Sequence, residues 1–135
     1  MDTAIEASFT PEVSTYNIVS GLMSNDCKPF RIAQGTMLWL HEDGFLGELE
    51  CIFPQIVDKP LCSYATGISQ REGFPQFEVR SLDNEDCIQN CEDGFIAWLV
   101  RDTTVDLQVC FKNVHFFFSI DELVAIEAHQ VLLVE

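Results

Sequence analysis

Apolar and polar residues alternate along several short segments of the chain. This two-residue period is typical of β-strands that bury one face. It is clearest over residues 105–111, where Val105, Leu107, Val109 and Phe111 are separated by Asp, Gln and Cys. The same alternation runs through residues 46–53. The pattern predicts a strand in each segment.

The strongest local signal is a β-hairpin over residues 37–53. The apolar run Met37–Leu40 is followed by the polar sequence His41-Glu42-Asp43-Gly44 and then by the second apolar run. An Asp-Gly pair between two such runs favours a tight turn, because glycine accepts the positive φ angle that the turn requires. Pro54 should end the second strand, because proline has no backbone N–H to donate to the sheet.

Other segments are less regular. Residues 54–75 contain three prolines and two glycines, which predicts a long connection with room for a short helical turn. Residues 77–82, 95–100 and 114–118 are predicted strands. Residues 119–128 fit either a helix capped by Ser119 or a strand, and we favour two strands, at 123–128 and 131–134. Residues 1–12 fit a loosely ordered arm or a short edge segment.

Together these segments predict a mainly β protein with seven to nine strands and little helix. Adjacent hairpins favour antiparallel pairing, in a two-sheet sandwich or one strongly curved sheet. The length of 135 residues suits a single globular domain, residues 1–135. The three consecutive residues Phe116–Phe118 cannot all face one side of a strand. Either both faces of that strand are buried or Phe117 is exposed.

The charge balance excludes some partners. The chain has 22 Asp and Glu against 7 Lys and Arg, a net charge of −15. Nucleic acids and anionic membranes are bound through basic residues, so neither is an expected partner. A basic protein is a better match, because opposite charges accelerate association. The acidic start, Met1–Glu6, does not resemble a secretory signal, so we expect a cytoplasmic, bacterial protein.

The six cysteines and three histidines predict no metal site. In a reducing cytoplasm the cysteines are expected to be free thiols. Cys87 and Cys91 are spaced by one helical turn, but no second pair of ligands has the spacing of a zinc site, since the histidines at 41, 115 and 129 are far apart in sequence. We therefore predict neither a metal nor another cofactor.

No established catalytic motif is present, which predicts a protein that is not an enzyme. Two arrangements remain as alternatives. Glu48 and Glu50 lie on the same side of a predicted strand, where paired carboxylates can serve a hydrolase or isomerase. Cys110 and His115 are close in sequence, and a nucleophilic pair would require a lowered thiol pKa.

An acidic segment is the most distinctive candidate binding surface. No Lys or Arg occurs between Arg80 and Arg101. Carboxylates there can replace phosphates in a cationic cleft. The predicted partner-binding residues are Asp83, Glu85, Asp86, Glu92 and Asp93, with Asp102 and Asp106 as secondary candidates.

The hairpin sequence Leu38-Trp39-Leu40-His41-Glu42-Asp43-Gly44-Phe45-Leu46-Gly47-Glu48-Leu49-Glu50-Cys51-Ile52-Phe53-Pro54, together with the size and the charge, resembles the small acidic immunity proteins of bacterial polymorphic and contact-dependent toxin systems. The resemblance implies a cytoplasmic protein that binds one cognate basic toxin domain, such as a nuclease, and blocks its active site. Two alternatives are a small-molecule-binding β module, suggested by the many aromatic residues, and a homodimeric structural protein.

Overall fold

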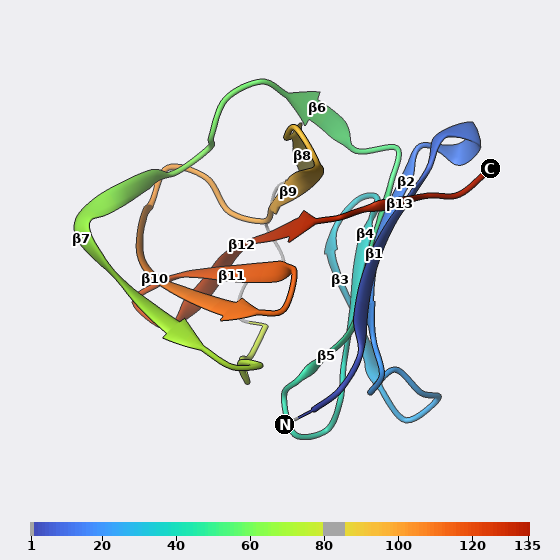
Figure 1. The fold of residues 1–135 in the computed structure, drawn as a ribbon, viewed down its shortest axis with the longest axis horizontal. Helices are drawn as coiled ribbons and strands as arrows, with labels where there is room; N and C mark the ends of the chain where they lie inside the picture. The colour runs from blue at the N-terminus through green and yellow to red at the C-terminus, as the bar shows by residue number, and fades with distance from the viewer. Residues whose placement is uncertain (1, 80–85) are drawn as a thin grey trace.

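Two β-sheets packed face to face make up the fold, in a computed structural model that describes residues 2–79 and 86–135 (Figure 1). The first sheet has the spatial order β13 (Leu132–Leu133), β1 (Ile5–Thr10), β2 (Thr15–Ser20), β5 (Leu46–Ile52), β4 (Thr36–Leu40) and β3 (Lys28–Ala33). The second has the order β6 (Gln55–Val57), β8 (Cys87–Asn90), β9 (Gly94–Trp98), β12 (Glu122–His129), β11 (Val114–Ser119), β10 (Thr104–Phe111) and β7 (Ser63–Glu72). A single 3₁₀ turn, Pro11–Val13, is the only helical element of the described residues. The predicted mainly β fold with little helix is therefore confirmed.

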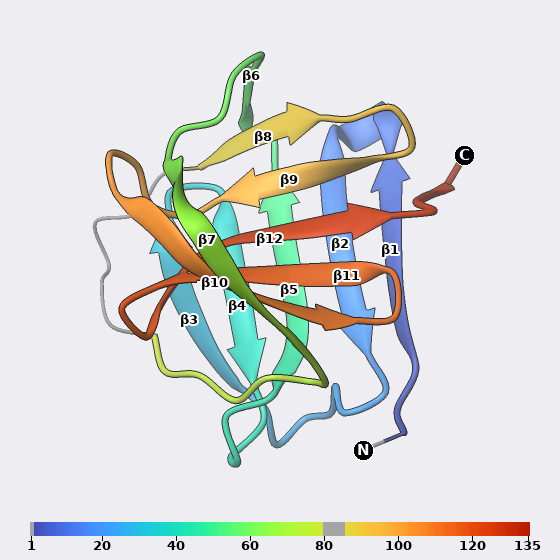
Figure 2. The same ribbon diagram turned by 60° about the vertical axis from the view of Figure 1, so that its left-hand side comes forward.

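The strands of the two sheets run crosswise (Figure 2). The chain passes from one sheet to the other at its C-terminal end, where β12 leads directly into β13 beside β1. Strands that change sheets in this way form the corners of crossed β-sandwiches.

The predicted hairpin at residues 37–53 is confirmed as β4 and β5. Met37 pairs with Glu50 and Leu38 with Leu49. The turn is closed by the His41 N–H, which donates to the Phe45 carbonyl over 2.9 Å. Gly44 has a φ of +90°, as expected for the glycine of a tight turn.

Pairing is antiparallel within the body of each sheet and parallel at three edges. The short strand β13 runs parallel to β1, β6 runs parallel to β8, and β7 runs parallel to β10. Sequence adjacency predicted the antiparallel hairpins but not these parallel edges, because each parallel pair joins segments that are far apart in the chain.

The main core lies between the two sheets. Ile18 and Leu49 of the first sheet and Phe95, Phe116 and Ile126 of the second are essentially inaccessible to water and belong to one apolar cluster. Burial of these large side chains supplies most of the driving force for packing the sheets together, at about 25 cal/mol per Å² of apolar surface.

A second apolar cluster covers part of the opposite face of the second sheet. Trp98, Phe117 and Ile96 are its largest buried residues, with Val57 and Leu61 packed against it from the segment that carries β6 and β7. Figure 1 shows this segment arching over the outer side of the second sheet. Phe117 is therefore buried on the outer face of β11, while Phe116 and Phe118 are buried on the inner face. Of the two alternatives for the phenylalanine triplet, burial of both faces is the correct one.

Several local predictions require correction. Residues 54–75 are not a plain connection but contain β6 and β7, and neither is helical. Residues 77–79 of the predicted strand 77–82 are not in a strand, although neighbouring Gln76 forms a bridge with Phe45; the rest of that segment lies outside the described residues. Of the two alternatives for residues 1–12, the loose arm is wrong, because this segment contains the short strand β1, next to the edge strand β13. The favoured strand at 123–128 is confirmed as part of β12.

All six cysteines are free thiols, as expected. Within the described ranges, no helix has the length and apolar character needed to traverse a bilayer.

Candidate functional site

The outer face of the second sheet is divided into an apolar and a polar half. The apolar half is the second cluster around Trp98 and Phe117. The polar half contains His115 on β11 and Glu127 and His129 on β12. All three side chains are partly accessible to solvent, with exposed fractions of 26 %, 18 % and 29 %. The polar half is the part of this face that an external ligand can reach.

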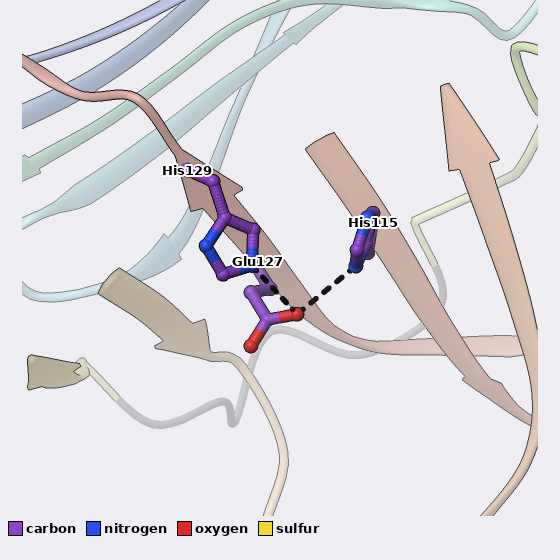
Figure 3. A group of neighbouring side chains, drawn as sticks. All are labelled: His115, Glu127 and His129. Atoms are coloured by element: carbon purple, nitrogen blue, oxygen red, sulfur yellow. Dashed lines mark hydrogen bonds and ion pairs between the residues drawn. The ribbon is translucent and has the colours of Figure 1, made fainter. Parts of the chain in front are cut away.

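Sheet geometry brings the three polar residues together. His115 and Glu127 are direct cross-strand partners, and cross-strand side chains on one face lie about 4.5–5.5 Å apart at Cβ. His129 follows Glu127 by two residues, so it points to the same face. We call His115, Glu127 and His129 the His–Glu–His cluster (Figure 3).

One carboxylate oxygen joins the two imidazoles of the cluster. Glu127 Oε1 lies 3.0 Å from His115 Nδ1 and 3.2 Å from His129 Nε2. The two rings are 5.3 Å apart between centroids. Two imidazole nitrogens and a carboxylate oxygen therefore converge on a small volume, an arrangement that can share protons or hold a cation.

Neighbouring polar groups orient the two histidines. His129 Nδ1 lies 2.7 Å from Asp93 Oδ1 in the β8–β9 turn, and His115 Nδ1 lies 3.1 Å from Gln108 Nε2 on β10. The hydrogen bond that His129 donates to Asp93 is the largest cause of a raised pKa for His129, and the Glu127 carboxylate acts in the same direction. The same hydrogen bond lowers the pKa of Asp93.

Asp93→Asn is expected to lower the pKa of His129, because it removes the negative partner that favours the imidazolium. A raised histidine pKa adds stability that is complete below the unfolded value of 6.5 and is lost as pH rises through the folded pKa. The lowered pKa of Asp93 adds stability above its unfolded pKa of 3.8, and this stability is lost as the pH falls through the folded pKa. The free energy of unfolding of the wild type should therefore exceed that of the variant mainly between pH 3.8 and pH 6.5.

The measurement is an NMR titration of the three histidine rings in the presence of a chelator, together with denaturation at several pH values. His41 serves as the internal control, because it lies in the β4–β5 turn away from Asp93. An unchanged His129 titration in Asp93→Asn would contradict this account.

Two thiols near the cluster are not activated. Cys110 is the cross-strand partner of His115, but burial, followed by the nearby Glu72 carboxylate, raises its thiol pKa. Burial and the Glu127 carboxylate likewise raise the pKa of Cys91. Since the thiolate is the nucleophile, the structure argues against the nucleophilic pair Cys110–His115 that the sequence suggested.

Among the acidic residues predicted to bind a partner, those that the structure describes are divided between the two ends of β9. Asp83 and Glu85 lie outside the described residues. Glu92 and Asp93 lie in the turn before β9, whereas Asp102 lies in the loop after it, and β9 separates the two groups. Glu92, Asp93 and Asp102 are exposed.

Besides Asp93, which bonds His129, two further predicted acids accept hydrogen bonds within the chain. Asp106 Oδ2 accepts from the Ile120 N–H over 3.1 Å. Asp86 accepts from the Gly35 N–H over 3.1 Å and also from the Thr36 hydroxyl. These contacts join the start of β4 to the start of β8, in the other sheet, which gives Asp86 a structural role in the isolated protein.

Asp86→Ala is expected to destabilise the fold by about 1–3 kcal/mol, because it leaves the fully buried Thr36 hydroxyl without its acceptor. The free energy of unfolding from urea denaturation measures this effect. Asp58→Ala is the matched control, because Asp58 is exposed and should change stability by less than about 0.5 kcal/mol. Equal values for the two variants would show that Asp86 has no structural role.

The paired carboxylates Glu48 and Glu50 meet one requirement for acid–base chemistry. Burial, followed by repulsion from Glu50, raises the pKa of Glu48. The Asn17 side-chain amide donates to Glu48 Oε2 over 2.9 Å and opposes this shift. The pair lies on β5, on the side of the first sheet that faces away from the main core.

Two of the hollows on the described surface bear on the candidate functions. One, of about 500 Å³, lies beside β7 and β10 and is lined by Phe74, Phe77 and Phe118, among others. Another, of about 250 Å³, lies between the two sheets at the β8–β9 turn, where Glu92 and Asp93 adjoin Leu132 and Leu133. The first resembles a small-molecule site in size, and the second combines carboxylates with exposed apolar side chains.

Sequence reasoning missed the His–Glu–His cluster, because zinc-site spacing rules consider ligands that are near one another in the chain. A signal was present. His115 and Glu127 are polar residues inside otherwise apolar strands, and Glu127 and His129 have the two-residue spacing of one strand face. Comparison with known proteins gives no further guidance, since no family model and no curated protein matches this chain.

Proposed function

We propose that this protein is a non-catalytic acidic binding protein that neutralises a basic protein partner, as an immunity protein neutralises a toxin domain. The observation that carries the proposal is the charge balance. The 22 Asp and Glu exceed the 7 Lys and Arg by 15, which gives the protein a strongly negative surface. Such a surface favours a cationic partner and accelerates its association.

The β8–β9 turn offers the best centre for an interface. Glu92 and Asp93 are exposed there and line the smaller hollow. Leu132 and Leu133, 51 % and 61 % exposed, form its apolar wall. An apolar centre with charges at its rim is the usual anatomy of a protein interface. Asp102 and Asp106, beyond the other end of β9, would provide a peripheral contact at most.

The proposal is tested by isolating the partner and reversing one charge. The tagged protein is purified from its native cell at low salt, the associated protein is identified, and its affinity is measured for the wild type and two variants. Glu92→Lys should weaken binding at least tenfold, because it places like charges in contact. Asp26→Lys makes the same charge change in the β2–β3 loop, at the other end of the first sheet, and should have a much smaller effect.

A growth assay links binding to protection. Cells that express the partner should survive when they also express the wild-type protein, and Glu92→Lys should protect less well than Asp26→Lys. Recovery of only a second copy of this chain would favour the homodimer instead. A partner without net positive charge, or equal affinities of the two variants, would refute the proposal.

The larger hollow supports a second candidate function, the binding of a small molecule. Phe74, Phe77 and Phe118 line the hollow together with Leu107, so part of its wall is aromatic. Native mass spectrometry after gentle purification would reveal a retained ligand. A Leu107→Trp variant that fills the hollow should abolish that retention.

A further inference from the structure

We propose that the His–Glu–His cluster is a binding site for a zinc ion, with His115 Nδ1, His129 Nε2 and a Glu127 carboxylate oxygen as its three protein ligands. This inference does not rest on the acidic-partner proposal, because it does not require a second protein, although Asp93 adjoins both the cluster and the proposed interface.

The distances between the ligand atoms are close to those of a zinc site. At zinc–ligand distances of about 2.0–2.1 Å, tetrahedral ligands lie roughly 3.3–3.5 Å from one another. Glu127 Oε1 is 3.0 Å from one nitrogen and 3.2 Å from the other. All three ligand atoms lie within 4.8 Å of one another. Small side-chain rotations would therefore place all three around one ion.

The residue types also fit zinc. Imidazole nitrogens and a carboxylate are common zinc ligands, and three protein ligands leave a fourth position for water or an external group. The three side chains are 18–29 % exposed, so an ion can enter from solvent and keep that fourth position open. The overall negative charge of the protein also raises the local concentration of cations.

Asp93 serves as the positioning residue of the site. Its carboxylate lies 2.7 Å from His129 Nδ1, which favours the tautomer with a proton on that nitrogen. The Nε2 lone pair, on the side of Glu127, is then available to the metal. A carboxylate that orients a zinc-bound histidine in this way is a common feature of zinc proteins.

The bonding within the cluster has one alternative explanation. Without a metal, Glu127 can act as an acceptor for two N–H groups, and the cluster would then be a surface hydrogen-bond network. At His115 the Gln108 side chain, 3.1 Å from Nδ1, would be displaced by an ion. The two explanations differ in what they predict for added zinc, because the network needs no ion and zinc would have to break it.

The test is a titration of metal-free full-length protein with Zn²⁺. Isothermal calorimetry measures the binding, and NMR of the imidazole nitrogens shows which histidines take part. We expect one ion per chain with a dissociation constant in the micromolar range or below. The His115 and His129 signals should shift, and the His41 signals should not. Co²⁺ in place of Zn²⁺ should give the visible absorption of a four- or five-coordinate site.

Variants assign the ligands. His115→Ala, His129→Ala and Glu127→Gln should each weaken zinc binding at least tenfold, whereas His41→Ala should bind like the wild type. Asp93→Asn should weaken binding about 10–100-fold, as expected for a group that orients a ligand. Each variant is first checked for folding by circular dichroism. The NMR shifts of the wild type test the site even if a variant does not fold.

Three results would overturn the inference. The first is binding only at millimolar zinc, which exposed carboxylates alone would explain. The second is micromolar binding that is unchanged in folded His115→Ala and His129→Ala. The third is zinc-induced shifts at His41 as large as those at His115 and His129.

Discussion

Phe117→Ala is expected to lower the free energy of unfolding by about 3–5 kcal/mol, as much as Phe116→Ala. The two side chains point to opposite faces of β11, but their exposed fractions are only 4 % and 0 %. Phe116 belongs to the main core, and Phe117 belongs to the second cluster. There the rings of Phe117 and Tyr64 make a T-shaped contact, with their centroids 5.8 Å apart. Removing either ring leaves a cavity that the rigid sheet cannot close.

Urea denaturation of both variants measures these effects. Leu133→Ala is the control, because Leu133 is 61 % exposed and should change stability by less than about 1 kcal/mol. A Phe117→Ala value near that of Leu133→Ala would mean that the second cluster does not contribute to the stability of the fold. A two-sheet sandwich with one core predicts that result, so the experiment separates the two architectures.

The sequence predicted the strands whose signals are local. Residues 37–53 combine period-two alternation with an Asp-Gly turn, and β4 and β5 form there. Residues 105–111 alternate in the same way and form β10, which pairs with β11 in a hairpin. In these segments one face of the strand is buried and the other is polar, so the burial pattern is visible in the amino-acid sequence itself.

The edge strands were missed because their sequences carry little burial signal. Most residues of β7 are exposed, so its residues do not alternate between apolar and polar. The strand is held by parallel pairing with β10, about forty residues away in the chain. Backbone hydrogen bonds with a distant segment leave no mark on local composition, and the prolines and glycines nearby suggested a connection instead.

In the candidate sites, too, the sequence predicted what depends on local residues and missed what depends on contacts between distant segments. The sequence identified the acidic residues, but it could not show that Asp86 accepts hydrogen bonds from Gly35 and Thr36. The His–Glu–His cluster depends on the register between β11 and β12, which includes a bulge between Phe117 and Phe118. A shift of one residue in that register would separate His115 from Glu127, so the cluster follows from the pairing of two strands and not from either one alone.

Gly94→Ala is expected to destabilise the fold by about 3 kcal/mol or more, at or above the upper end of typical overpacking costs. A Cβ at this position would lie 1.8 Å from the Ala128 carbonyl oxygen and 3.0 Å from the His129 Cα. Both atoms belong to the backbone of β12, which cannot rotate away as a flexible side chain could. The substitution therefore forces β9 and β12 apart where Gly94 pairs with His129.

Because the strain is applied directly beneath His129, Gly94→Ala should also disturb the His–Glu–His cluster. Urea denaturation gives the loss of stability, and NMR of the His129 ring reports its displacement. Gly67→Ala is the control, because nothing lies within 4 Å of its added Cβ and only its φ of +72° opposes the change, at about 1–2 kcal/mol. If Gly94→Ala costs no more than Gly67→Ala and leaves the His129 signal in place, the close approach of β9 to β12 does not position this histidine. If it costs more and moves that signal, a residue without a side chain sets the geometry of the cluster.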